Sequence, residues 1–187
     1  MIGDLDQDDW DKLLEATSRM MEAPLLIDDQ SGISPNHIRK VARQAKEEYP
    51  DLGMIIVDYL QLMQSSRQQN SREQEIADIS RSMKAIAKEF NLPVIALSQL
   101  NRDLERRADK RPMMSDLRES GALEQDADLI LFIYRDEIYN SESEDKNIAE
   151  INLAKHRNGE IGGCRLAFIG QYTKFANLAL GNDPAMP

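Results

Sequence analysis

Hydrophobic side chains recur every three or four residues in three stretches of the chain, and this spacing predicts helices that bury one face. The stretches are residues 4–22, a segment that opens at Ser34 and ends at Pro50, and residues 71–90. Ser34 is a residue type that commonly caps a helix N-terminus, and Pro35 behind it suits a first helical turn.

Four other stretches are apolar without interruption except for polar residues at one end. They cover residues 25–28, 54–59, 93–98 and 128–134. Continuous apolarity is typical of strands that are covered on both faces, as in a parallel sheet. Since most of these runs alternate with the helical segments, the sequence predicts a parallel sheet flanked by helices.

The pattern changes after residue 140. Residues 148–155, 164–169 and 173–178 look like strands joined by short turns that contain glycine, and short links favour antiparallel pairing. The predicted fold class is therefore α/β, a parallel sheet with an antiparallel C-terminal extension. The length of 187 residues suits one domain with a single core.

Charge and composition narrow the functional classes only partly. The net charge of −10 taken alone argues against a polyanionic partner, although residues 102–111 concentrate basic side chains, either as a solvated surface or as a local nucleic-acid contact. No apolar run is long enough to span a bilayer, and the acidic N-terminus lacks a signal-peptide pattern. Cys164 is the single cysteine, which favours a reducing cytoplasmic setting and a cysteine packed within a strand.

Two polar residues follow predicted strands, where open α/β sheets place their ligands. Asp58 comes after an apolar run, which is the Walker B pattern, and its carboxylate can hold Mg²⁺ through water beside nucleotide phosphates. Gln99 directly follows the next run, where its amide can contact a terminal phosphate or the attacking water. The alternatives are an aspartate that caps the next turn and an ordinary polar strand end.

Two further segments carry residue types that bind phosphate. In residues 116–121, Arg118 can pair with a phosphate, and Gly121 allows a close approach of the backbone to a ligand. Lys155 and Arg157 precede a glycine turn and can reach a nucleotide held by a neighbouring subunit, as an arginine finger does. An ordinary helix-capping loop and a charged hairpin tip are the competing interpretations.

Several kinds of site are missing from the sequence. No G-x-x-x-x-G-K-S/T occurs, so the chain has no evident loop that cradles phosphates. His37 and His156 are far apart in sequence and form no set of metal ligands, and no Ser-His-Asp or Cys-His arrangement is evident.

Taken together and in order, six short words resemble the DnaB family of bacterial replicative helicases over nearly the whole chain. They are residues 56–63 (Ile-Val-Asp-Tyr-Leu-Gln-Leu-Met), 96–102 (Ala-Leu-Ser-Gln-Leu-Asn-Arg), 109–112 (Asp-Lys-Arg-Pro), 116–121 (Asp-Leu-Arg-Glu-Ser-Gly), 124–128 (Glu-Gln-Asp-Ala-Asp) and 155–159 (Lys-His-Arg-Asn-Gly). The Arg-Glu-Ser-Gly and Lys-His-Arg-Asn-Gly words favour this family over RecA-like recombinases and phage primase-helicases.

The resemblance implies a RecA-like motor that uses ATP and Mg²⁺ and works as a homohexameric ring on single-stranded DNA at the replication fork, with primase and a loader. Asp58 is then the Walker B acid, and Gln99 is the phosphate sensor. Arg118, Glu119 and Gly121 match the family's DNA-contacting loop. Lys155 and Arg157 match the pair that reaches a neighbour's nucleotide.

The resemblance also implies that the phosphate-binding loop, the catalytic glutamate and the N-terminal collar domain lie upstream of Met1. The expectation is a C-terminal portion of the motor, over residues 1–187, that comes from a shortened form or an incomplete sequence of a longer protein. By itself this portion is expected to be inactive. A non-catalytic fragment that binds DNA or a partner is the alternative of a different class.

Overall fold

A computed structural model describes residues 6–66 and 69–178, except for the side chains of residues 118–120. The chain divides into two compact units, Met1–Gln30 and Ser31–Pro187, and each is described by itself. Among the described residues, no helix is both long and apolar enough to cross a membrane.

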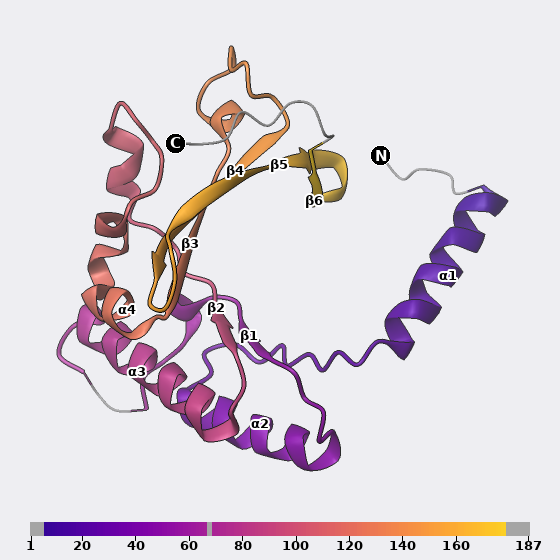
Figure 1. The fold of residues 1–187 in the computed structure, drawn as a ribbon. Helices are drawn as coiled ribbons and strands as arrows, with labels where there is room; N and C mark the ends of the chain where they lie inside the picture. Colours follow the sequence, from indigo (N-terminus) through magenta and orange to yellow (C-terminus); the bar gives the residue numbers. More distant parts are fainter. Residues whose placement is uncertain (1–5, 67–68, 179–187) are drawn as a thin grey trace. The chain divides into compact units, whose positions relative to one another are not determined.

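In the described residues of the first unit, 6–30, the helix is α1 (Gln7–Glu22), drawn in indigo in Figure 1. Its N-cap is Asp6, whose side chain accepts a hydrogen bond from the backbone of Asp9 at 2.8 Å. The predicted helix is confirmed where the structure describes it. The strand predicted at 25–28 is wrong: these residues form no strand, and Leu25 and Ile27 are exposed. A strand needs a paired neighbour, and no described segment pairs with this one.

The second unit begins with two helices that pack against a pair of parallel strands. Helix α2 (Pro35–Glu48) is capped by Ser34, as predicted, and helix α3 (Arg72–Phe90) follows an N-cap at Ser71. Strands β1 (Ile55–Val57) and β2 (Val94–Ala96) pair in parallel, with Ile55 opposite Val94.

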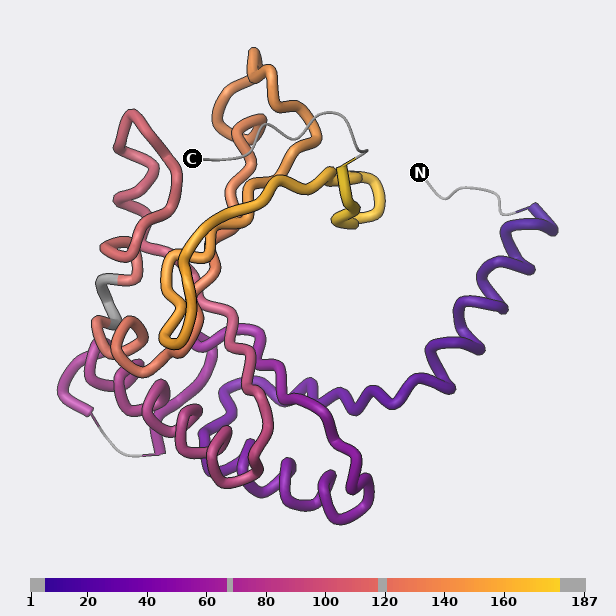
Figure 2. Tube along the Cα trace, in the orientation of Figure 1, coloured from indigo at the N-terminus to yellow at the C-terminus, as the bar shows by residue number. Residues whose placement is uncertain are grey.

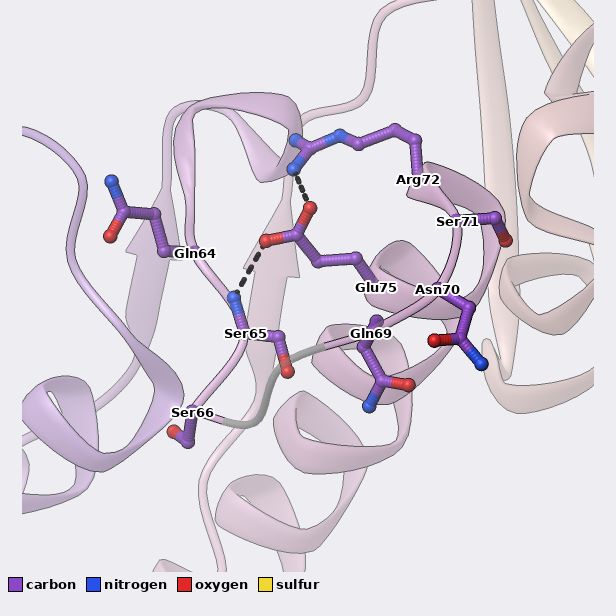
Figure 3. Close-up of a pocket in the computed structure, with 8 residues that line it drawn as sticks. All are labelled: Gln64, Ser65, Ser66, Gln69, Asn70, Ser71, Arg72 and Glu75. Carbon is purple, nitrogen blue, oxygen red and sulfur yellow. Dashed lines mark hydrogen bonds and ion pairs between the residues drawn. The ribbon is translucent and has the colours of Figure 1, made fainter.

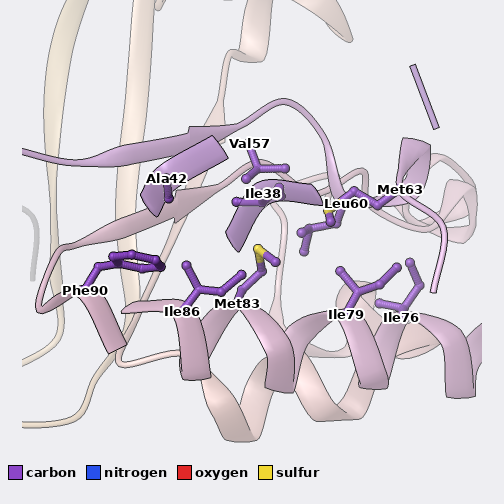
Figure 4. Close-up of a cluster of buried hydrophobic side chains, with 10 residues drawn as sticks. All are labelled: Ile38, Ala42, Val57, Leu60, Met63, Ile76, Ile79, Met83, Ile86 and Phe90. Carbon is purple, nitrogen blue, oxygen red and sulfur yellow. The ribbon is translucent and has the colours of Figure 1, made fainter. Parts of the chain in front are cut away.

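The largest core lies between these helices and strands, and Figure 4 shows its side chains converging above α3. It comprises Ile38, Ala42, Val57, Leu60, Met63, Ile76, Ile79, Met83, Ile86 and Phe90. Burying each large aliphatic side chain contributes about 1.5–3 kcal/mol, so this cluster is the main source of stability for the parallel pair.

The prediction that the strands are covered on both faces is wrong for the described residues. Val57 is buried against the helices, but Ile56 is 59% exposed and Ile95 is 48% exposed. Successive side chains of a strand point to opposite faces, so α2 and α3 cover one face only.

Four strands form a separate antiparallel sheet in the order β3-β4-β5-β6, which the orange to yellow trace of Figure 2 follows. They are β3 (Leu129–Tyr134), β4 (Ile148–His156), β5 (Gly162–Ile169) and β6 (Lys174–Asn177). The predicted antiparallel extension is confirmed. The prediction of β3 as a further buried parallel strand is wrong, because β3 pairs antiparallel with β4 and its burial alternates.

Short helical turns link the sheets. The helix α4 (Gly121–Asp126) follows a 3-10 segment, Met114–Ser120, and leads into β3. Leu117 of that segment packs with Ile130 and Phe132 in a second, smaller core. Cys164 lies in β5 but is exposed, so the expected packing of its side chain is wrong.

Candidate functional site

Asp58 and Gln99 follow neighbouring parallel strands, at the same edge of the pair. Hydrogen bonding continues past the ends of the strands, since the Leu97 N–H donates to the Val57 carbonyl at 2.9 Å and the Leu60 N–H to the Leu97 carbonyl at 3.0 Å. Both Asp58 and Gln99 are exposed. The structure therefore brings together the two residues that the sequence assigned to nucleotide phosphates.

The side chain of Gln61 connects these two strand ends, a contact that the sequence did not reveal. Its Nε2 donates to Ser98 Oγ at 2.9 Å and to the Gln99 carbonyl at 3.2 Å, while its Oε1 accepts from the Gln99 N–H at 3.1 Å. Gln61 belongs to the short 3-10 turn Leu60–Leu62 that follows Asp58. Its position in the Asp-Tyr-Leu-Gln word was the only signal available, and spacing alone does not show where a side chain points.

The backbone of Gln61 is itself held by the start of α3. The Arg72 guanidinium donates to the Gln61 carbonyl at 2.6 Å and pairs with Glu75, as Figure 3 shows for the ion pair. Glu75 also accepts from the Ser65 N–H at 2.9 Å. This backbone hydrogen bond, reinforced by Arg72, lowers the pKa of Glu75 below its ordinary value. The carboxylate thus stays charged at neutral pH.

An open polar cavity of about 520 Å³ lies in front of this ion pair. Its walls are drawn in Figure 3 and consist of Gln64, Ser65, Ser66, Gln69, Asn70, Ser71, Arg72 and Glu75. The lining is hydrophilic, so the cavity lacks the apolar walls of an ordinary small-molecule pocket.

Lys155 and Arg157 lie at the end of β4, before the turn into β5, and both dock on α4. Lys155 Nζ donates to the carbonyls of Glu124 and Gln125, and an Arg157 guanidinium nitrogen donates to the Gln125 carbonyl at 3.1 Å. These carbonyls belong to the C-terminal turn of α4, where the helix dipole favours a cation. The two predicted finger residues are therefore close together and occupied by contacts within the chain.

Asp128 is the acidic partner of Arg157 beside the C-terminus of α4. It forms an ion pair with Arg157 at 3.4 Å and accepts a hydrogen bond from Lys84 of α3. Chiefly through the hydrogen bond from Lys84, the pKa of Asp128 is lowered from its ordinary value. Since Ser80 of α3 also donates to Asp126 at 2.8 Å, α3 supports this region as well as the Gln61 contact.

The predicted DNA-contacting residues lie where the 3-10 segment meets α4. The side chains of Arg118 and Glu119 are outside the described residues, so their roles stay predictions. Gly121 has ordinary helical angles, and a Cβ added there meets no atom within 4 Å. Nothing in the described chain requires a glycine at this position, so its predicted close approach would have to involve a molecule outside the chain.

The base of this loop is fixed by an ion pair between buried Asp116 and half-buried Arg107. Asp116 is buried and receives two hydrogen bonds from Arg107, at 2.9 and 3.2 Å, while also capping the Met113 N–H at 2.8 Å. Arg111 pairs with Glu150 at 2.7 Å. Arg107 and Arg111 of the basic stretch 102–111 are therefore held by carboxylates outside it, so the stretch is only partly available to a nucleic acid.

Comparisons with known proteins show which family the chain belongs to. Residues 1–177 match the family model described as the DnaB-like helicase C terminal domain. The chain belongs to this family. The chain is 58% identical over 180 residues to the replicative DNA helicase DnaB of Pasteurella multocida, and 53% identical over 184 residues to that of Geobacillus stearothermophilus. These matches cover 96% and 98% of the chain but only 38% and 40% of the DnaB proteins.

Solved structures of similar proteins share the fold. One is described as the structure of a DnaB-like replicative helicase and its interactions with primase, and another is described as an ATPase domain. Each has a TM-score of 0.90 and 48% identity over 94% of this chain, covering 42% and 62% of the respective solved chains. The predicted family and the fold class are thereby confirmed.

The oxygen atoms of Asp58 fit one feature of a nucleotide site, the binding of Mg²⁺ beside the phosphates. Residues 6–66 and 69–178 contain no group of three or more His, Cys, Asp or Glu side chains that could hold a metal. The carboxylate of Asp58 is exposed and makes no hydrogen bond or ion pair with these residues. A lone free carboxylate suits Mg²⁺ that is held mainly by water and phosphate oxygens, and does not suit a cage of protein ligands.

Proposed function

We propose that this chain is part of an ATP-driven replicative helicase that moves on single-stranded DNA and unwinds duplex at the replication fork. The observation that carries the proposal is the position of Asp58 and Gln99 just beyond the ends of two paired parallel strands, β1 and β2, in a chain of the DnaB-like family. Binding of ATP with Mg²⁺ at that edge supplies the phosphoanhydride bond whose hydrolysis drives the movement.

Asp58 and Gln99 serve the nucleotide bound by their own subunit. The Asp58 carboxylate orients the water ligands of Mg²⁺, and the Gln99 amide contacts the terminal phosphate or the attacking water. Both side chains are exposed at the sheet edge, which leaves them accessible to a nucleotide. Loss of the terminal phosphate removes the partner of Gln99 and so signals the hydrolysis step.

Lys155 and Arg157 serve the nucleotide of the neighbouring subunit in a homohexameric ring. To reach it they leave the α4 carbonyls, and the phosphate charge replaces those contacts. The DNA-contacting residues Arg118, Glu119 and Gly121 stand directly before α4 in the chain. A change at α4 is thus shared between the finger pair and the DNA loop, which couples hydrolysis to movement along DNA.

The names of the similar proteins support a proposal for the location and partners of this chain. Several are named replicative DNA helicases of bacteria, and one solved relative is described together with primase. We accordingly propose a cytoplasmic location at the replication fork, with primase and a helicase loader as partners.

Residues 1–187 alone are expected to be inactive, since their sequence contains no G-x-x-x-x-G-K-S/T loop. That same feature favours the second candidate function, a non-catalytic fragment that binds DNA or a partner. The test is ATP hydrolysis, with and without single-stranded DNA, by this chain and by a chain that continues upstream through a phosphate-binding loop.

The outcomes of this test separate the two functions. Hydrolysis by the longer chain only, stimulated by DNA and lost in Asp58→Asn, supports the motor. Hydrolysis by residues 1–187 unaided contradicts the expected requirement for the loop. An inactive longer chain that still binds DNA favours the non-catalytic alternative.

A further inference from the structure

The amide of Gln61 is matched to the backbone of Gln99 group for group. One amide N–H donates to the Gln99 carbonyl at 3.2 Å, the other to Ser98 Oγ at 2.9 Å, and the amide oxygen accepts from the Gln99 N–H at 3.1 Å. The Ser98 hydroxyl in turn lies 3.4 Å from the Gln99 carbonyl. Both main-chain groups of Gln99 are therefore bound by one side chain.

This contact lies where the regular pairing of the strands has stopped. The paired register of β1 and β2 ends at Val57 and Ala96, and the segment that carries Gln99 has no strand beside it among the described residues. The Gln61 side chain takes the place of a neighbouring backbone, because a primary amide offers a donor and an acceptor just as a peptide group does. The Gln61 amide thereby fixes the backbone orientation of Gln99, which sets the direction of the Gln99 side chain.

Gln61 is well anchored for this task. Its neighbour Leu60 is 1% exposed and donates its N–H to the Leu97 carbonyl at 3.0 Å. The Gln61 carbonyl receives the Arg72 guanidinium at 2.6 Å. Because the backbone of Gln61 is held on both sides, binding Gln99 costs only the rotamer freedom of the Gln61 side chain.

We propose that Gln61 is a positioning residue for nucleotide hydrolysis. It holds the backbone of Gln99 so that the Gln99 side chain faces the terminal phosphate of a nucleotide bound beside Asp58. The inference rests on the proposed function, since it assigns Gln61 a role only if Gln99 acts on the phosphate. It links the turn after Asp58 to Gln99, so the two strand ends keep one geometry during the reaction.

The test uses Gln61→Met in a chain that continues upstream through a phosphate-binding loop. Methionine keeps the length of the side chain but removes the amide donors and acceptor. We expect kcat for ATP hydrolysis to fall about 10- to 100-fold, as for a misplaced catalytic group. The KM for ATP is expected to stay within about twofold, because Gln61 does not touch the nucleotide.

A double-mutant cycle identifies the partner of Gln61. If Gln61 acts through Gln99, adding Gln61→Met to Gln99→Ala causes no further loss of kcat. Gln44→Met makes the same chemical change on the exposed face of α2 and should leave kcat unchanged. Thermal unfolding is measured for each variant, and Gln61→Glu, which keeps the acceptor for the Gln99 N–H, replaces Gln61→Met if the latter does not fold.

The outcomes separate this inference from the proposed function. If Gln99→Ala hydrolyses ATP normally, the proposed role of Gln99 fails. If Gln99→Ala is impaired while the folded Gln61 variant is normal, or if the two losses multiply in the double variant, the positioning role of Gln61 is overturned and the role of Gln99 stands.

Discussion

The two sets of candidate phosphate-binding residues are held in opposite ways. At the parallel pair, the backbone after each strand is hydrogen-bonded while the side chains of Asp58 and Gln99 remain exposed. At the antiparallel sheet, the cationic ends of Lys155 and Arg157 are themselves bound, to the C-terminal carbonyls of α4.

The difference suits the distinct tasks proposed for the two sets. A side chain projecting from a fixed backbone is preorganised for a ligand bound in its own subunit. A side chain that must first leave an internal partner suits a contact that is made and broken in each cycle. Both sets are supported by α3, since Arg72 binds Gln61 while Lys84 binds Asp128.

The largest expected effect is on Arg157, which belongs to the set proposed to move. In the chain that carries a phosphate-binding loop, Arg157→Ala should lower kcat for ATP hydrolysis by about 10³-fold, because an arginine finger neutralises charge in the transition state. Arg81→Ala removes an exposed arginine of α3 and serves as the control. ATPase activity within about tenfold of wild type in Arg157→Ala would show that the pair acts on something other than the nucleotide.

The next largest effect is on stability, through the two hydrophobic clusters on which the candidate residues rest. Ile79 is fully buried in the larger cluster under the parallel pair, and Ile130 is 8% exposed in the smaller one. Ile79→Ala should cost about 2–5 kcal/mol in the free energy of unfolding, and Ile130→Ala should cost less. Urea unfolding measures both, with exposed Leu131→Ala as the control. An equal loss of unfolding free energy in Ile79→Ala and Ile130→Ala would show that the two clusters stabilise the molecule to the same extent.

The smallest effect concerns the acid that holds Arg157 in place. Because Lys84 and Arg157 lower the pKa of Asp128 in the folded chain, its ionisation stabilises the fold above the ordinary aspartate pKa of 3.8. That stabilisation is lost as the pH falls through the lowered value. The difference in unfolding free energy between wild type and Asp128→Asn should therefore shrink below pH 3.8. A difference that stays constant from about pH 6 to about pH 3 would contradict the ion-pair contribution.

Residues with local signals were predictable from the sequence. Ser34 and the apolar spacing of 71–90 define helices that the structure contains, because caps and periodic faces act within a few residues. The location of Asp58 and Gln99 after neighbouring strands was also predictable, since an apolar run followed by a polar residue marks the end of a strand, whereas their roles stay predictions.

Contacts between distant residues were not predictable. Gln61 meets Gln99 across 38 positions, and Lys155 meets Glu124 across 31, so no local pattern announces either contact. The segment 25–28 fails for a related reason: its apolar run has the composition of a strand, but a strand also requires a partner that the described residues do not provide.

In the proposed ring, one subunit's Asp58 and Gln99 act together with the next subunit's Arg157. Asp58→Asn and Arg157→Ala are each made in the chain that carries a phosphate-binding loop and are then assembled together. We expect each variant alone to be inactive and the mixed assembly to hydrolyse ATP, because some interfaces pair an intact Asp58 with an intact Arg157. No recovery in mixed rings of verified composition would contradict a site shared between subunits.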